Sequence, residues 1–135
     1  MIFPAVCANA QSDAVEQILK QAIGRHQSGD IEGAIEAYRK YLASRPDSPI
    51  ALSNLGAAYA RVARYEDAIA QYRHALKVQP GNTPVELNLG LAYYKTGRKE
   101  LAAGILEKFI GPLRMNCSPR SCWRIAGWPW GSTRM

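Results

Sequence analysis

Apolar residues recur along most of the chain at helical spacing, in short stripes separated by turn-forming residues. Leu52, Leu55 and Tyr59 step by three and four positions, and a second stripe runs from Ala68 to Tyr72. Turn-rich strings separate the stripes: SGD at 28–30, RPDSP at 45–49, QPGN at 79–82 and KTGR at 95–98. The pattern therefore predicts six helices, at residues 13–28, 31–45, 49–62, 65–78, 84–96 and 99–111.

The stripes repeat with a period of 34 residues. The clearest unit is 49–82, and it is preceded by 15–48 and followed by 83–111. Residues that recur at this period include Ala34, Ala68 and Ala102; Tyr38 and Tyr72; Pro46 and Pro80; Leu55 and Leu89; Gly56 and Gly90; Tyr59 and Tyr93; and Gly29, Ala63 and Gly97. A fixed period of this length indicates stacked helix–turn–helix units.

Two helix starts carry explicit signals. Ser48 precedes Pro49, and a proline in the first helical turn loses no needed donor. The string from Thr83 to Glu86 has the spacing of a capping box, with Thr83 as the expected N-cap.

The period, the Leu-Gly…Tyr run and the Ala…Tyr…Pro run resemble those of tetratricopeptide repeats (TPRs), over about 15–111. The resemblance implies an all-α fold, a right-handed superhelical solenoid of about three helix pairs. The first unit departs from the pattern, because Gln21, Ala22 and Arg25 stand where Leu, Gly and Tyr are expected. The third unit has Phe109 where the second unit has Ala75, and it lacks the closing proline that the other two units have at Pro46 and Pro80.

TPR proteins bind extended peptides or helices on the inner face formed by the first helix of each pair. The resemblance therefore implies a protein-interaction adaptor with a protein or peptide partner. Residues of the first helices that the core does not require are Glu16, Lys20, Ile23, Gln27, Ile50, Ser53, Asn54, Ala57, Arg61, Leu87, Asn88, Leu91, Tyr94 and Lys95. From these, the predicted groove consists of Lys20, Gln27, Asn54, Arg61, Asn88, Tyr94 and Lys95.

Asn54 and Asn88 occupy the same place in successive units, directly before Leu-Gly. An amide offers a donor and an acceptor, so it can hold a peptide backbone regardless of the peptide's side chains. The pair resembles the asparagine ladder in the repeat region of O-linked N-acetylglucosamine transferases and their bacterial relatives. Lys20 stands at the corresponding place in the first unit, which limits the ladder to two rungs. A commonplace solvated asparagine is the competing interpretation.

Other chemistries find little support in the sequence. The carboxylate clamp of co-chaperone repeats needs Lys and Asn in the first repeat and Lys and Arg in the third, where this chain has Leu19, Ile23, Pro84 and Asn88. Only Asn54 fits, so a clamp is not expected. His26 and His74 have no credible catalytic relay, and we expect solvated side chains for both. We therefore expect no catalysis, no small-molecule substrate, no cofactor and no metal. The alternative is that the chain is the substrate-docking fragment of a larger glycosyltransferase-like enzyme.

The net charge of +6 raises the question of nucleic acid. Four of the 17 basic residues and no acidic residue lie in 112–135, which leaves 13 basic and 11 acidic residues elsewhere. This balance favours an ordinary mixed-charge surface, and nucleic acid is not the expected partner. Binding of nucleic acid or of a membrane surface through the basic tail is a weaker alternative. No apolar run is long enough to span a membrane.

The two terminal segments, 1–12 and 112–135, fall outside the repeat array at 13–111. Ala8-Asn9-Ala10 resembles a signal-peptidase site, so the first segment is either the remnant of a signal peptide or a frayed cytoplasmic terminus. The compartment, cytoplasmic or exported, stays open with it. The three cysteines suggest neither a disulfide framework nor a zinc site, although Cys117 and Cys122 could pair in an exported protein.

The last segment contains all three tryptophans and shows no helical stripe. Three interpretations stay open for it: a cover for the apolar side of the last unit, a membrane- or nucleic-acid-binding tail, or an abnormal, out-of-frame terminus. Because Ile105, Leu106 and Phe109 lack an obvious cover, self-association through the uncapped last unit is also possible.

Overall fold

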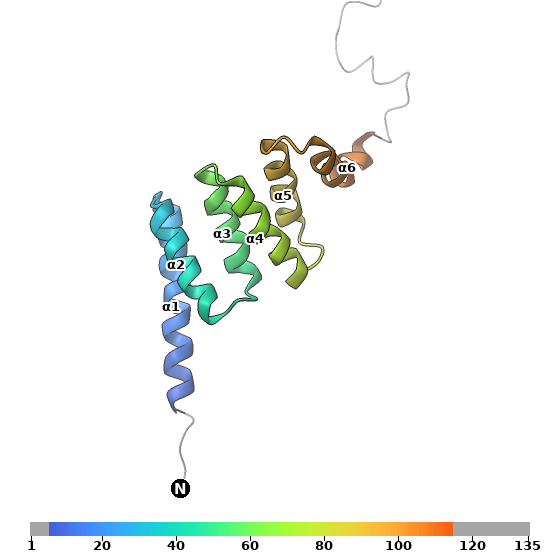
Figure 1. The fold of residues 1–135 in the computed structure, drawn as a ribbon. Helices are drawn as coiled ribbons and strands as arrows, with labels where there is room; N and C mark the ends of the chain where they lie inside the picture. The colour runs from blue at the N-terminus through green and yellow to red at the C-terminus, as the bar shows by residue number, and fades with distance from the viewer. Residues whose placement is uncertain (1–5, 115–135) are drawn as a thin grey trace, which may run out of the picture.

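The computed structural model describes residues 6–114, and these form six helices without a strand. Consecutive helices form three antiparallel pairs that lie side by side (Figure 1). The helices are α1 (Val6–Ser28), α2 (Ile31–Ser44), α3 (Pro49–Arg61), α4 (Tyr65–Val78), α5 (Thr83–Lys95) and α6 (Lys99–Arg114). The prediction of an all-α, right-handed superhelical solenoid of three pairs is confirmed.

The outer ends of the array extend further than the apolar pattern predicted. Helix α1 begins at Val6 rather than 13 and reaches beyond the end of α2 (Figure 1). Neither glycine nor proline occurs between Pro4 and Gly24, so no residue there opposes helix propagation. Helix α6 continues to Arg114, past its predicted end at 111, and includes Pro112 in its last turn. The interpretations of residues 115–135 lie outside the described residues.

Side-chain caps fix where three of the helices begin. Asp30 Oδ1 accepts from Gly33 N at 3.1 Å, and Ser48 Oγ accepts from Ala51 N at 3.5 Å. The predicted capping box at Thr83 is wrong. The N-cap of α5 is Asn82, whose Oδ1 accepts from Val85 N at 3.4 Å. An asparagine is as good an N-cap as threonine, and it starts the helix one residue earlier.

The tight turn that joins the helices of a pair has the same geometry in the second and third pairs. The backbone N–H of Arg64 donates to Tyr59 O, and that of Arg98 donates to Tyr93 O, both at 2.9 Å. This six-to-one bond is that of a Schellman motif, which requires a left-handed residue just after the helix. Gly97 fills that place in the third pair, but the second pair has Ala63 at φ 60°.

The core lies between the paired helices and between successive pairs. Tyr38 and Tyr72 are 1% and 2% exposed, and burial raises the pKa of the Tyr72 phenol to about 12. Tyr72 packs where α3 presents Gly56, and a Cβ built on that glycine would lie 2.6 Å from the Tyr72 ring. The repeated Ala34, Ala68 and Ala102 are almost fully buried, as expected for close helix contacts.

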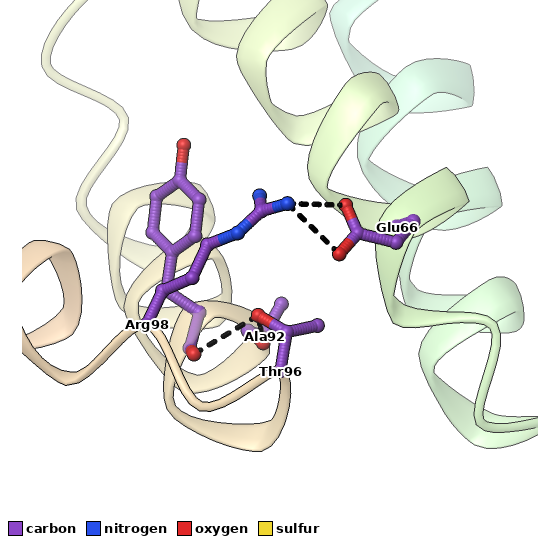
Figure 2. Close-up of polar contacts among 5 residues, drawn as sticks. Glu66, Ala92, Thr96 and Arg98 are labelled. Atoms are coloured by element: carbon purple, nitrogen blue, oxygen red, sulfur yellow. Dashed lines mark hydrogen bonds and ion pairs between the residues drawn. The ribbon is translucent and has the colours of Figure 1, made fainter.

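One polar contact also joins the second pair to the third. The Arg98 Nη2 atom, in the turn before α6, donates to both carboxylate oxygens of Glu66 in the first turn of α4, at 3.0 and 3.1 Å (Figure 2). The guanidinium also lies 5.9 Å from the centre of the Tyr93 ring. Thr96 Oγ1 donates to Tyr93 O at 3.0 Å and to Ala92 O at 3.2 Å, and so adds a side-chain bond to two carbonyls that also accept from backbone N–H groups (Figure 2).

Candidate peptide-binding groove

The first helices of the three pairs, α1, α3 and α5, carry all seven residues predicted to line the groove. Six of these fill two repeat positions, with Lys20, Asn54 and Asn88 at one and Gln27, Arg61 and Lys95 at the other. The two positions are seven residues apart in each helix, which is close to two turns, so they lie on the same side of the helix. We call these six residues the polar edge.

The polar edge is open to solvent. Asn54 is half-buried, and the other five residues are exposed. Within the described residues, the side-chain amides of Asn54 and Asn88 form no hydrogen bond. Each amide therefore has its donor and its acceptor available to a ligand. This accessibility is what a ladder requires, and the assignment of the two asparagines as its rungs stays a prediction.

Arg61 has a structural contact that the sequence did not predict. Its Nη1 donates to the backbone oxygen of His26 at 3.4 Å, and this carbonyl, in the last turn of α1, also accepts from Gly29 N at 3.4 Å. The guanidinium thus joins the ends of α1 and α3. It has five N–H donors, so the contact leaves most of them for a ligand. No local spacing signals such a contact between residues 35 positions apart.

His26 is packed rather than solvated, so that prediction is wrong. Its ring lies 6.1 Å from the Tyr38 ring in an edge-to-face arrangement, and the residue is half-buried. Burial, and to a lesser extent the charge of Arg61, lower the pKa of His26 below its ordinary value of 6.5. His26 is therefore neutral at pH 7. His74 is closer to the expectation, because its side chain is 43% exposed beside Asp47.

A row of exposed apolar side chains runs along α5 beside the polar edge. Leu87, Leu91 and Tyr94 are 38%, 53% and 57% exposed, and their spacing of four and three places them on one side of the helix. We call these three residues the apolar strip. Leu19 and Ile23, at the positions of Leu87 and Leu91 in the first unit, pack against the core. The strip is therefore a feature of the last pair alone.

A surface depression lies elsewhere on the molecule. It has a volume of about 590 Å³ and is lined by residues of α4, among them Arg73, His74 and Lys77. It contains none of the predicted groove residues. No cluster of His, Cys, Asp or Glu within residues 6–114 is suited to a metal ion. None of the described helices combines the length and apolarity needed to cross a membrane.

Residues 8–106 match the family of the N-terminal TPR repeats of the surface lipoprotein assembly modifier. The chain belongs to this TPR family. The match covers most of the array and includes the first unit, whose Leu-Gly…Tyr run is absent. No curated protein sequence matches the chain significantly. The likeness of the TPR chain to the repeats of glycosyltransferases stays a prediction.

Solved structures with the same fold include those of three different proteins. MamA is 26% identical with a TM-score of 0.70, over 76% of this chain and 60% of MamA. The first TPR of Spaghetti (RPAP3), bound to the HSP90 peptide SRMEEVD, is 19% identical with a TM-score of 0.67, over 83% and 90%. The Sgt2 TPR domain from Aspergillus fumigatus is 22% identical with a TM-score of 0.66, over 90% and 89%. One of these fold neighbours thus has a peptide bound.

Proposed function

We propose that the chain is an adaptor that binds an extended peptide segment along α1, α3 and α5, without chemistry of its own. The observation that carries the proposal is the pair Asn54 and Asn88, which recur 34 residues apart. Their side-chain amides have no hydrogen bond to a described residue. In this arrangement each amide donates to a backbone carbonyl of the peptide and accepts from a backbone N–H. Burial of ligand side chains on the apolar strip adds affinity.

The decisive variant combines Asn54→Ala with Asn88→Ala. A hydrogen bond contributes about 0.5–1.5 kcal/mol net, so losing the four bonds of the two rungs should weaken binding by about 30-fold or more. The ligands are peptides selected from a random display library on the wild-type chain, and binding is measured by fluorescence anisotropy. Helicity and melting temperature should stay nearly unchanged, because neither amide bonds to another described residue.

A matched control removes two amides outside the predicted groove, by Gln21→Ala with Gln71→Ala. Gln21 lies on the side of α1 that faces α2, because it lines a depression together with Gly33 and Glu36 of that helix, and Gln71 lies on α4. The control should bind as the wild type does. Equal affinity of the asparagine variant and the control would contradict the ladder, and a library that yields no ligand would contradict the adaptor function.

A narrower proposal concerns the source of the partner. The match over residues 8–106 is to repeats named for surface lipoprotein assembly, so we propose that the bound segment belongs to a protein of that process. Co-expression with a surface lipoprotein from the same source, followed by purification through a tag on the lipoprotein, tests this. The wild-type chain should co-purify and the asparagine variant should not. Failure to recover the wild-type chain would contradict the proposal, and equal recovery of both would place the contact outside the two asparagines.

A further inference from the structure

The charges on the polar edge are of one sign. Lys20, Arg61 and Lys95 are exposed cations, one on each first helix, and the other three members of the edge are uncharged amides. His26 adds no charge at pH 7, because burial and Arg61 lower its pKa. The acidic residues on the same side of α1 are Glu16, whose Oε1 lies 4.0 Å from Arg45 Nη1, and exposed Asp13, seven residues before Lys20. Both lie on the N-terminal side of Lys20. A ligand at the two repeat positions of the edge therefore meets three cations and no carboxylate.

The apolar strip lies next to the end of this charged row. Tyr94 directly precedes Lys95, and Leu87 directly precedes Asn88, so the apolar and polar rows run in parallel along α5. At 100° per residue, Leu87, Leu91 and Tyr94 lie within about 60° of one another, and Lys95 is about 40° beyond Leu91. The strip and Lys95 can thus contact one bound segment at the same time.

We propose that the segment bound in the groove is acidic and carries a large apolar side chain: its carboxylates face Lys20, Arg61 and Lys95, and its apolar side chain covers Leu87, Leu91 and Tyr94. The inference rests on the proposed adaptor function and defines its ligand class. Opposite charge selects the partner and fixes its register, and the apolar anchor supplies burial. These acid-binding residues differ from the clamp positions, where the chain has Leu19, Ile23 and Pro84.

Two other occupants fit the surface less well. A second copy of the chain carries a net charge of +6, so its approach to a cationic edge is opposed by like-charge repulsion. A nucleic acid would satisfy the three cations. However, each first helix supplies only one cation to this edge, and exposed Leu87 and Leu91 offer nothing to a phosphate backbone. Both occupants are outcomes of the test below.

The test begins with the library selection described above, carried out on the full chain. The selected peptides should be enriched in Asp and Glu and should contain a Leu, Ile or Phe. One selected peptide is then synthesised in three forms: unchanged, with each acid replaced by Lys, and with its large apolar residue replaced by Ser. We expect each replacement to weaken binding at least about tenfold, and the affinity of the unchanged peptide to fall as salt is raised.

Charge reversal in the protein separates the groove from general electrostatics. Lys95→Glu should weaken binding of the unchanged peptide by about tenfold or more, whereas Lys77→Glu should not. Both lysines lie in the last turn of a helix, so the two variants change the helix-end charge and the net charge equally. Melting curves of both variants check that they fold alike.

The outcomes distinguish this inference from the proposed function. Ligands selected without acidic enrichment, or equal losses in Lys95→Glu and Lys77→Glu, would overturn the inference and leave the adaptor function standing. A library with no ligand would overturn both. If a single-stranded oligonucleotide binds as tightly as the acidic peptide, the ligand of this surface would be assigned as nucleic acid instead of a peptide. A dimer by light scattering that Leu91→Ser dissociates would assign the strip to a second copy.

Discussion

At the scale of single residues, the two repeated glycines differ in how much room surrounds them. An added Cβ at Gly56 would lie 2.6 Å from the ring of Tyr72, a residue that is only 2% exposed. At Gly90 the nearest atoms are methyl groups of Ile105 and Leu106, at 3.2 and 3.3 Å, on half-buried side chains. Identical residues at one repeat position therefore face different constraints.

We predict that Gly56→Ala lowers the free energy of unfolding by about 1–3 kcal/mol, because overpacking outweighs the better helix propensity of alanine. Gly90→Ala should be nearly neutral, because small shifts of Ile105 and Leu106 relieve a contact that is only slightly short. Denaturant unfolding of the two variants measures both values. Equal destabilisation at the two sites would contradict this account.

At the scale of helices and turns, the Schellman turn between α3 and α4 contains an unfavourable residue. Ala63 holds φ at 60°, whereas Gly29 and Gly97 occupy the equivalent turns at φ 90° and 79°. A left-handed conformation costs a residue with a Cβ about 1–2 kcal/mol, and glycine avoids this cost. The repeat pattern aligned the three residues, but only the backbone angle shows that the alanine adopts the glycine conformation.

Ala63→Gly should therefore raise the free energy of unfolding, by about 0.5–1 kcal/mol after the greater flexibility of glycine in the unfolded chain is included. Thermal or denaturant melts report the change. A matched substitution, Ala70→Gly on the exposed side of α4, should instead destabilise the chain, because it places glycine inside a helix. A decrease in stability for Ala63→Gly would contradict the prediction.

At the scale of the whole molecule, stability depends on pH through a residue at the contact between the first two pairs. His26 packs against Tyr38, and its backbone oxygen accepts from Arg61. Its pKa is lowered in the folded chain, so the unfolded chain binds protons more readily as the pH falls below about 6.5. The contribution of His26 to stability is thus complete above that pH and is lost as the pH falls toward its folded value.

We predict that the melting temperature falls between pH 7.5 and 5.5, and that His26→Gln makes this fall smaller. Arg61→Gln should also reduce it, but by less, because burial lowers the pKa more than the Arg61 charge does. Melting temperatures of the three proteins across this pH range provide the measurement. An acid response in His26→Gln identical to that of the wild type would exclude His26 as its source.

The array also differs from one end to the other. Tyr38 and Tyr72 are buried because a following pair covers them, whereas Leu106, at the same repeat position, is half-exposed in the last pair. Leu101 on α6 is 53% exposed and was not among the predicted surface residues. The repeat supplies the same apolar face three times, but among residues 6–114 only two of these faces have a neighbouring pair to cover them.

The sequence by itself determined the six helices, their pairing and the two positions of the polar edge. Helix periodicity, turn residues and the 34-residue repeat are local or regular signals, so they need no knowledge of the tertiary structure. Only the structure decided which of the equivalent residues are exposed to solvent and which contact neighbouring helices. In the structure, His26 packs against Tyr38, and Arg61 contacts the end of α1. Leu87 and Leu91 are exposed, whereas the equivalent Leu19 and Ile23 pack against the core. The reason is physical: exposure and long-range contacts depend on the neighbouring pairs, which differ along the array.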